Sequence, residues 1–258
     1  MLWLFDLPTM ALAGLFALVF VGFTWFGIIF IRPLFRLLFR RQPGLNDLVG
    51  YILSSHCAFF GLLLGLLAVA AYQNLVSVEQ VVNREAGFLR AIHRSMASYP
   101  EPVRSEVQGL IRDYTRFIIE EAWPLQRKGI VTSAGAPMTD EMYAKVFAFE
   151  PQTKAQEILH TQTVVQLNQM AELRRARIQA VGTGLPPLMW YVVGAGTMIT
   201  ILLLWMLDMR LIPHLILSGV LVLFLSTVIC LVAVTDGPFP GEISIGPEAY
   251  LAVYERID

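Results

Sequence analysis

The residues best suited to do chemistry in this chain lie close together at positions 54–60, which read SSHCAFF. His56 is the one residue of 48–78 that can carry a positive charge, and no Asp, Glu, Lys or Arg accompanies it. An ionisable side chain inside an apolar span indicates function, here ion conduction or pH sensing. Near the end of a span the same side chain reaches water and is an ordinary interfacial residue. Both interpretations of His56 stay open.

Small residues form a strip along one helical face of the same stretch. They recur every three or four residues, at Gly50, Ser54, Ala58, Gly61 and Gly65. Small side chains let helix backbones approach one another in lipid, which favours a packing seam. They also leave room in a channel wall, which favours a pore lining. The two interpretations can hold at different depths of the membrane.

Enzymatic motifs are missing from the sequence. It contains no HExxH, no GxSxG, no phosphate-binding glycine loop and no CxxC. The four histidines, at 56, 93, 160 and 214, have no metal-ligand spacing. We therefore expect no catalytic residue, no metal and no cofactor. The near-neutral net charge of −1 argues against nucleic acid as a partner.

The composition is that of an integral membrane protein. The chain is 56% hydrophobic and 15% charged, whereas soluble domains average about 25% charged residues. A membrane-spanning helix needs about 20 mainly apolar residues. Four stretches meet this requirement, near 10–31, 50–72, 187–207 and 212–234.

The spans divide the chain into two pairs with a polar segment between them. Residues 1–72 form the first pair, joined by a basic amphipathic loop with Arg32, Arg36, Arg40 and Arg41, which suits a lipid headgroup layer. Residues 73–185 form a helical soluble domain, and 186–235 form a second, tightly turned transmembrane hairpin. The proline-rich residues 236–258 are expected to dock as a cap, so that everything forms one structural unit. The fold is predicted to be all-α.

Helical periodicity gives a more detailed expectation for the soluble part. The second span continues as helix to residue 98, and an apolar stripe follows at 101–128. Thr139 or Asp140 is expected to cap a short helix, and Pro151 to open a long one that ends near residue 180, with Ile158, Val165 and Leu173 facing inward. In the tail, the apolar residues are expected to dock: Phe239, Ile243, Ile245 and Tyr250.

Four spans place the soluble segment and the tail on one side of the membrane. Arginines near the span ends number five on each side, so their count does not orient the chain. Arg84 and Arg90 lie along a helix away from the membrane and count less. This weakly favours the soluble helices lying outside the cytoplasm.

Taken in order, these segments resemble the bestrophin-like family of bacterial and plant membrane proteins. The motifs that carry the resemblance are spread over most of the chain: Asn46-Asp47, Glu79 to Ala86, Tyr114 with Glu120-Glu121-Ala122-Trp123-Pro124, Arg174-Arg175-Ala176-Arg177, Gly184 to Trp190, and Pro238 to Ala249. The family usually has Ser or Arg where Pro240 stands, and Asp where Glu242 stands.

The resemblance implies a likeness to bestrophins, which are anion channels with four spans per subunit in a ring-shaped homo-oligomer. It implies that the second span lines the pore and that aromatic residues form its neck, which makes Phe59 and Phe60 candidates. Bestrophins place the soluble helices in the cytoplasm, opposite to the weak preference from charge. The calcium-binding acidic cluster of animal bestrophins is not visible here.

The sequence therefore predicts an ion channel in the bacterial inner membrane, whose partners are the lipid bilayer, ions and copies of itself, with a pentamer as one candidate ring. In this model the strip packs against another span, and Phe59 or Phe60 narrows the axis. His56, one turn from Phe60 on the same face, would lie in the vestibule, where a proton gained near pH 6–7 would bias ion access. The alternative is a non-conducting sensor or scaffold whose helical domain binds a partner.

Overall fold

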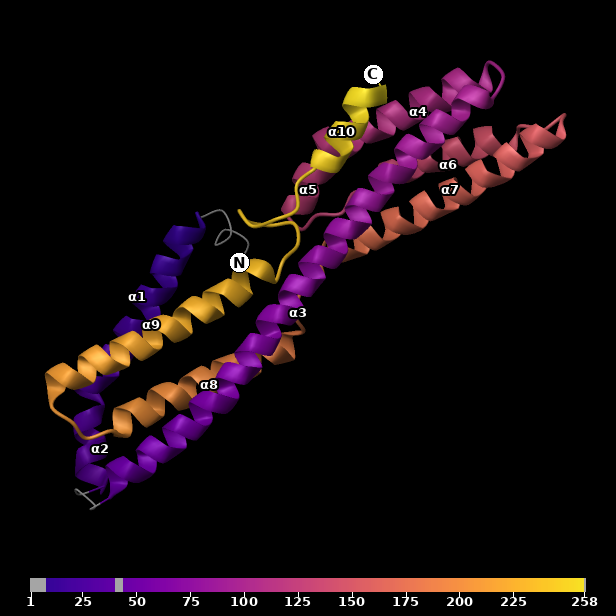
Figure 1. Ribbon diagram of the computed structural model, residues 1–258. Helices are drawn as coiled ribbons and strands as arrows, with labels where there is room; N and C mark the ends of the chain where they lie inside the picture. Colours follow the sequence, from indigo (N-terminus) through magenta and orange to yellow (C-terminus); the bar gives the residue numbers. More distant parts are fainter. Residues whose placement is uncertain (1–7, 40–43, 258) are drawn as a thin grey trace. The chain divides into compact units, whose positions relative to one another are not determined.

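A computed structural model describes residues 8–39 and 44–257, and within these ranges it contains helices and no strands (Figure 1). The all-α expectation is confirmed. Among the described residues, four helices are long and apolar enough to cross a membrane: α1 (Thr9–Phe30), α3 (Leu45–Ser95), α8 (Pro187–Met206) and α9 (Leu211–Thr235). The others are α2 (Arg32–Phe39), α4 (Val103–Phe117), α5 (Trp123–Arg127), α6 (Gly135–Phe147), α7 (Lys154–Ala180) and α10 (Glu248–Ile257).

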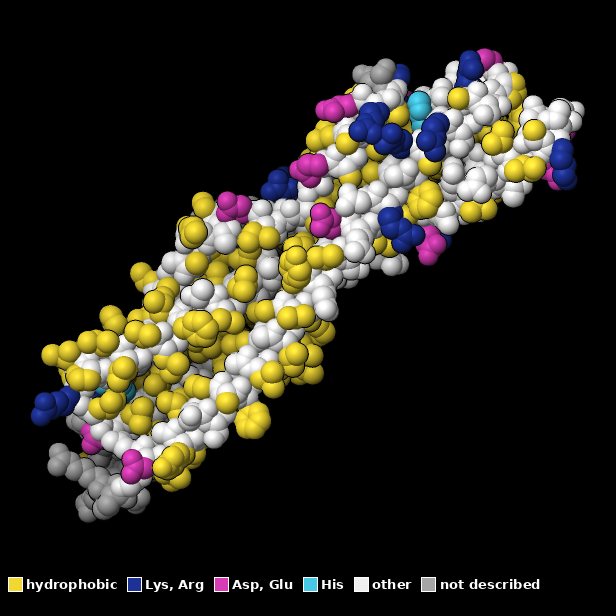
Figure 2. All heavy atoms as spheres, viewed as in Figure 1, with side chains coloured by type: hydrophobic (Ala, Val, Ile, Leu, Met, Phe, Trp, Pro, Cys, Tyr) yellow, Lys and Arg dark blue, Asp and Glu magenta, His cyan; other side chains and the backbone are white. Residues whose placement is uncertain are grey.

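The chain divides into two compact units, each with its own core. Unit 1 holds the residues up to Gln73, together with 184–236 and 241–243. Unit 2 holds 74–183, 237–240 and 244–258. The continuous helix α3 contributes residues to both. Hydrophobic side chains dominate the visible surface over α8, α9 and the first half of α3, whereas charged side chains lie over the helices of unit 2 (Figure 2).

In unit 1, α1 lies along α9 and also contacts α8 (Figure 1). The contact with α8 depends on Gly27, because a Cβ there would overlap the indole ring of Trp205. The Trp205 Nε1–H donates to the carbonyl of Thr24 at 3.0 Å, so the buried indole keeps a hydrogen-bond partner. Apolar packing and one buried hydrogen bond therefore hold this pair of helices.

The turn between α8 and α9 is tied to the start of α2 and α3. Arg32 forms an ion pair with Asp208 at 3.2 Å, and Asn46 exchanges two hydrogen bonds with the backbone of Asp208. The sequence suggested that Arg32 belongs to a basic surface that faces the lipid headgroups. Instead, Arg32 is only 4% exposed and is a structural residue. Arg40 and Arg41 lie outside the described residues, and Arg36 lies within α2 but its side chain is not described.

At the opposite end of the same helices, acidic side chains hold the segment before α8 and the start of α1. The carboxylate of Asp236 accepts from the backbone N–H of Leu185 and from Trp190 Nε1. The Glu242 carboxylate accepts from both the backbone N–H and the hydroxyl of Thr9, at 2.8 and 2.7 Å. The first N–H groups of a helix lack partners within it, so Glu242 acts as a cap for α1.

The core of unit 2 includes residues of the C-terminal segment. Trp123 contacts Phe239 edge-on with ring centroids 5.4 Å apart, and Tyr250 at 5.7 Å. Phe239 and Tyr250 are fully buried and Ile245 is 9% exposed, whereas Ile243 is 42% exposed. Three of the four apolar tail residues therefore pack inside, and the expectation that Ile243 docks is wrong.

A five-residue π-helix, Ile118–Ala122, joins α4 to α5. With the turn of α5 that follows, it keeps Ile118, Ala122 and Trp123 all buried. Each hydrogen bond of a π-helix spans one residue more than in an α-helix, so the inward face shifts around the helix. A prediction based on a constant α-helical period does not include this shift.

Two other expectations for unit 2 are wrong. The short helix begins at Gly135 rather than at Thr139 or Asp140, and a Cβ at Gly135 would crowd the rings of Phe117 and Tyr114. Thr153 caps α7, because its side chain accepts a hydrogen bond from the backbone N–H of Gln156. Within α7, the side chains of Ile158 and Val165 are exposed. Its inward face instead carries Thr163, Leu167, Met170, Leu173 and Arg177. Two of these are polar, so apolar spacing alone misplaced the face.

Candidate functional site

One side of the membrane-spanning half of α3 is covered by other helices of the same chain. Phe60, Leu64, Leu67 and Ala71 recur at spacings of four, three and four and are at most 6% exposed. The first three share a cluster with Val193 of α8 and with residues of α9: Leu225, Ile229 and Val232. This side of α3 forms the interior of unit 1.

The rest of α3 is uncovered, and the strip of small residues lies there, with Gly61 and Gly65 at the edge of a cavity shared with α8 and α9. Ser54, Ala58, Gly61 and Gly65 are exposed and Gly50 is half-buried. A Cβ added at Gly50, Gly61 or Gly65 would meet no other atom within 4 Å. Nothing within the described part of the chain therefore requires glycine at these three positions.

Large apolar residues occupy the adjoining flank of the uncovered side. Phe59 is 75% exposed, Leu62 64% and Leu66 61%. Their spacings of three and four place them along one line of a helix. Leu62 and Leu66 were not predicted as lining residues from the sequence, although they follow Phe59 at helical spacing.

Phe60 and Phe59 have opposite environments in this structure. Phe60 packs on Gly196 of α8, where a Cβ would overlap its ring, whereas Phe59 points away from the chain's own helices. Adjacent helix positions differ by about 100°, so one of the two is covered and the other is free. Of the two aromatic candidates for a pore neck, only Phe59 is free of intrachain packing.

His56 contacts α8 through hydrogen bonds. Its Nε2 lies 3.0 Å from the carbonyl oxygen of Gly196 and 3.0 Å from Oγ1 of Thr200. The imidazole also stacks on Phe60, with ring centroids 5.5 Å apart and an interplanar angle of 21°. Thr200 was not anticipated from the sequence, where a threonine inside a span gives no sign of which helix it faces.

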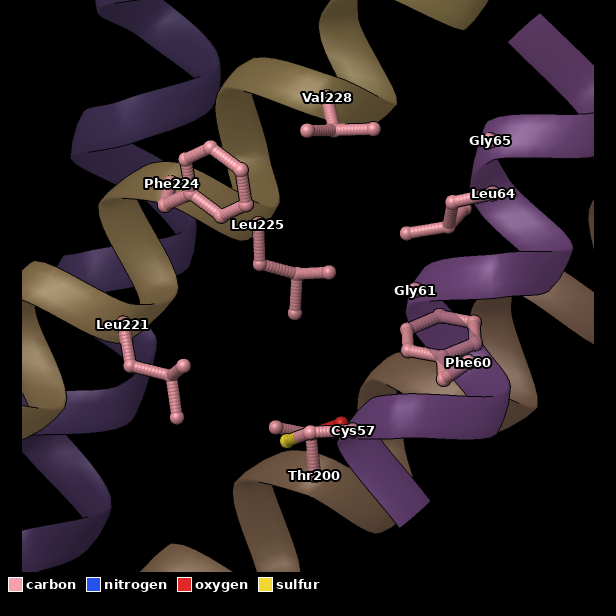
Figure 3. A pocket seen from close by; sticks show the side chains of 10 residues that line it. All are labelled: Cys57, Phe60, Gly61, Leu64, Gly65, Thr200, Leu221, Phe224, Leu225 and Val228. Atoms are coloured by element: carbon pink, nitrogen blue, oxygen red, sulfur yellow. The ribbon is translucent and has the colours of Figure 1, made fainter. Parts of the chain in front are cut away.

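An apolar cavity of about 360 Å³ lies between α3, α8 and α9 (Figure 3). Gly61 and Gly65 of the strip form part of its α3 wall, and Figure 3 shows Leu221, Phe224, Leu225 and Val228 facing them from α9. A second cavity of about 450 Å³ lies between α1 and α8, with Phe16, Phe20 and Trp190 in its lining. These apolar linings suit hydrocarbon chains. They offer few polar groups that could replace the hydration shell of an ion.

The charged side chains buried in unit 2 centre on one ion pair. Arg177 donates from Nε to Glu85 Oε2 at 2.7 Å and from Nη2 to Oε1 at 3.2 Å, and Tyr114 donates its hydroxyl to Oε1 at 3.1 Å. Burial opposes the charge of Arg177, yet the adjacent Glu85 carboxylate holds the pKa of the guanidinium well above its usual value. Burial, and then Glu85, raise the pKa of both Tyr114 and Tyr250.

This pair joins separate helices of unit 2. Glu85 lies on α3, Tyr114 on α4 and Arg177 on α7, and Arg177 also donates to Gln126 of α5 at 2.9 Å. The Arg177 guanidinium lies over the ring of Tyr250, from α10, at 5.7 Å. The described residues contain no group of three or more His, Cys, Asp or Glu side chains that could hold a metal ion. The arrangement is that of a structural hub.

The comparison with solved structures identifies the fold. The chain is similar to a bacterial bestrophin homologue from Klebsiella pneumoniae, with a TM-score of 0.63 and 11% identity over 93% of this chain and 96% of that one. A second structure of that homologue gives a TM-score of 0.61, also at 11% identity, over 92% and 96% of the two chains. A third structure, described as that of a membrane protein, gives 0.62 at 12% identity, over 94% of each chain.

Sequence comparison places the chain in a family. No curated protein matches it. The family model described as the Bestrophin-like domain matches residues 18–250, which include all four apolar helices except the first residues of α1. This agrees with the motifs found along the sequence, from Asn46-Asp47 to the proline-rich tail. The chain therefore belongs to the Bestrophin-like family.

Proposed function

We propose that this membrane protein is a homo-oligomeric ion channel in which copies surround an axis lined by the membrane-spanning half of α3. The observation that supports the proposal most directly is the uncovered side of α3, where glycines stand that no intrachain contact explains. Gly27 and Gly196 are required by Trp205 and Phe60, but Gly50, Gly61 and Gly65 meet open space. Contact with a second copy supplies the missing reason.

In this proposal the two flanks of the uncovered side have different roles. Small residues favour close approach of helices in lipid, so the strip packs against a neighbouring subunit. Phe59, Leu62 and Leu66 then face the axis and form a hydrophobic constriction, of the kind that gates by loss of water. The likeness of the family to bestrophins favours anions as the permeant ions.

The cavities of unit 1 are consistent with conduction between subunits rather than through one. Both are lined almost wholly by apolar side chains. An ion that leaves water needs polar or charged groups to replace its hydration shell. A single copy therefore offers no suitable path in either cavity, and a ring of copies is needed, for which a pentamer is the first arrangement to test.

We also propose that protonation of His56 changes ion access. No Asp, Glu, Lys or Arg occurs in 48–78 or in α8, so a charge on this imidazole would act without a nearby counter-charge. Histidine is the side chain of this stretch that can change its charge by gaining a proton. Flux through the wild type should then differ between acidic and neutral pH, whereas flux through His56→Gln should not.

The proposal assigns the protein to the bacterial inner membrane and gives it no enzymatic activity. The test has two stages. The mass of the purified protein, in detergent and in lipid nanodiscs, should be a multiple of the 28.9 kDa chain. Liposomes that contain the oligomer should then pass ions, and Phe59→Ala and Leu62→Ala should increase the flux because each widens the constriction.

Phe30→Ala is the matched control, because Phe30 is 65% exposed on α1 and lies outside the proposed lining. Equal flux in the control and in the Phe59 and Leu62 variants would show that the constriction is not formed by Phe59 and Leu62. An intact oligomer that passes neither anions nor cations at any pH would refute the channel. The alternative function, a membrane sensor or scaffold that binds a partner, would then take its place.

A further inference from the structure

The contact between His56 and α8 has a defined direction of hydrogen bonding. The Gly196 carbonyl can only accept, and the Thr200 hydroxyl donates its one proton to that same carbonyl at 3.0 Å. The hydroxyl therefore has only lone pairs left for His56. Both partners of His56 thus accept, and Nε2 must carry a proton and donate it to them at 3.0 Å each.

A second contact fixes the next turn of α3 to the same turn of α8. Phe60 lies over Gly196, where any Cβ would overlap its ring, and the His56 ring stacks on Phe60. Gly196 and Thr200 are four residues apart, as are His56 and Phe60. Polar and aromatic contacts therefore hold one face of α3 against one face of α8 over a full helical turn.

Apolar packing alone sets the rotation of a helix in lipid weakly, because lipid tails compete equally well for apolar side chains. A hydrogen bond differs, because the donor has no alternative partner in hydrocarbon and losing it leaves a buried polar group unsatisfied. Within α3 the run 48–78 offers few side-chain donors, and His56 uses its donor on α8.

We propose that His56 is a positioning residue which fixes the rotation of α3 about its own axis and thereby selects Phe59, rather than Phe60, for the uncovered side. A rotation of about 100° would exchange the two rings. The consequence for conduction rests on the proposed channel, since rotation of α3 would change which side chains face the axis. The positioning itself is a property of one subunit.

A cross-link within the chain measures the rotation without reference to conduction. The pairs His56–Thr200 and Phe60–Gly196 step by four residues in opposite directions along the two helices. The next buried residues along the seam are Leu64, four after Phe60, and Val193, three before Gly196. Both are buried in one cluster. Cysteines at these two positions, in a chain with Cys57→Ala and Cys230→Ala, should form a disulfide on mild oxidation. After trypsin cleavage of the segment between them, the disulfide keeps the two fragments together on a non-reducing gel.

The expected result is a loss of cross-linking in His56→Leu and its recovery in His56→Gln, whose side-chain amide places an N–H near the position of Nε2. Loss of one such hydrogen bond corresponds to roughly a two- to tenfold decrease in the initial cross-linking rate. Thr200→Val, which removes one acceptor and keeps the shape, should give a smaller decrease. Thr227→Val is the matched control, because Thr227 bonds only within its own helix, to the carbonyl of Leu223.

Wild-type rates in both His56→Leu and Thr200→Val would overturn the positioning role. If His56→Leu does not assemble, Thr200→Val decides the matter alone, and a wild-type rate in that variant overturns the positioning role. Flux is the second measurement, and His56→Leu should change it while His56→Gln at neutral pH restores it. Absence of flux in the wild type, with the cross-linking pattern as expected, would refute the channel and leave the positioning role standing.

Discussion

Arg177 holds both carboxylate oxygens of Glu85, although the two residues lie 92 positions apart. The side chains are 2% and 0% exposed. Removing one partner of such a pair leaves a buried charge uncompensated, at a cost of about 3–5 kcal/mol. Glu85→Ala and Arg177→Ala should each lower the thermal unfolding temperature strongly. Arg175→Ala is the control, because Arg175 is exposed on the same helix.

The double variant Glu85→Met/Arg177→Met should destabilise the protein by less than the sum of its single changes, because no unpaired charge remains. An additive result would mean that the two side chains stabilise unit 2 independently of each other.

The buried aromatic contact in the C-terminal segment gives a second prediction. Phe239 is fully buried against Trp123, so Phe239→Ala should cost about 3–5 kcal/mol of unfolding free energy. Ile243→Ala, four residues along, should stay within about 0.5 kcal/mol of the wild type because its side chain is exposed. Thermal unfolding of the two variants in one detergent compares them directly, and equal melting temperatures would contradict the packing of Phe239.

The cap that Glu242 forms on α1 should depend on pH. Hydrogen bonds from the Thr9 backbone N–H and hydroxyl lower the pKa of the Glu242 carboxyl below its usual 4.5. A carboxyl whose folded pKa is lowered stabilises the fold above its unfolded pKa, and this contribution disappears as the pH falls through the folded value. Unfolding temperatures of wild type and Glu242→Ala should therefore differ at neutral pH and converge in acid.

Glu242→Gln separates the charge of this cap from its geometry. The amide oxygen can still accept from Thr9 but does not titrate, so the difference between this variant and Glu242→Ala should persist in acid. A wild type that keeps its full advantage over Glu242→Ala well below pH 4.5 would contradict the role of the carboxylate.

Leucine at three glycines should distinguish intersubunit from intrachain packing. Gly61→Leu should disrupt the oligomer by overpacking the seam, at about 1–3 kcal/mol per site. Gly196→Leu should destabilise each subunit, because its side chain meets Phe60. Gly14→Leu on α1, which also meets open space but lies outside the strip, should change neither property. If Gly61→Leu leaves the oligomer intact and blocks flux, the strip is a pore wall instead of a seam.

The arrangement of spans predicts the sidedness of the polar segments. Thiols introduced at the exposed Ser133 and Ala252 should react with a membrane-impermeant reagent from the same side, and a thiol at the exposed Asp47 from the other. Whole cells and inverted vesicles then show which side is cytoplasmic. Reaction of Ser133→Cys and Ala252→Cys from opposite sides would contradict the four-span arrangement.

Local properties of the sequence predicted the helices of this protein. Uninterrupted apolar runs indicated all four long apolar helices, because the length needed to cross hydrocarbon is a property of a single segment. Residues Lys154–Ala180 were also expected as one long helix, although its inward face was not. Ile158 and Val165 were expected inside, and Arg177 lies there in their place.

Only the tertiary structure decided which side of each helix is covered. Phe59 and Phe60 are identical in type and adjacent in sequence. Phe60 is the one that is buried, because it packs on Gly196, which follows it by 136 residues. Arg174, Arg175 and Arg177 are likewise alike, yet Arg177 alone pairs with Glu85. Burial depends on the helix that packs opposite, which can lie anywhere along the chain. Sequence periodicity defines the faces of a helix, but the packing of distant segments determines which face is buried and which is left for a partner.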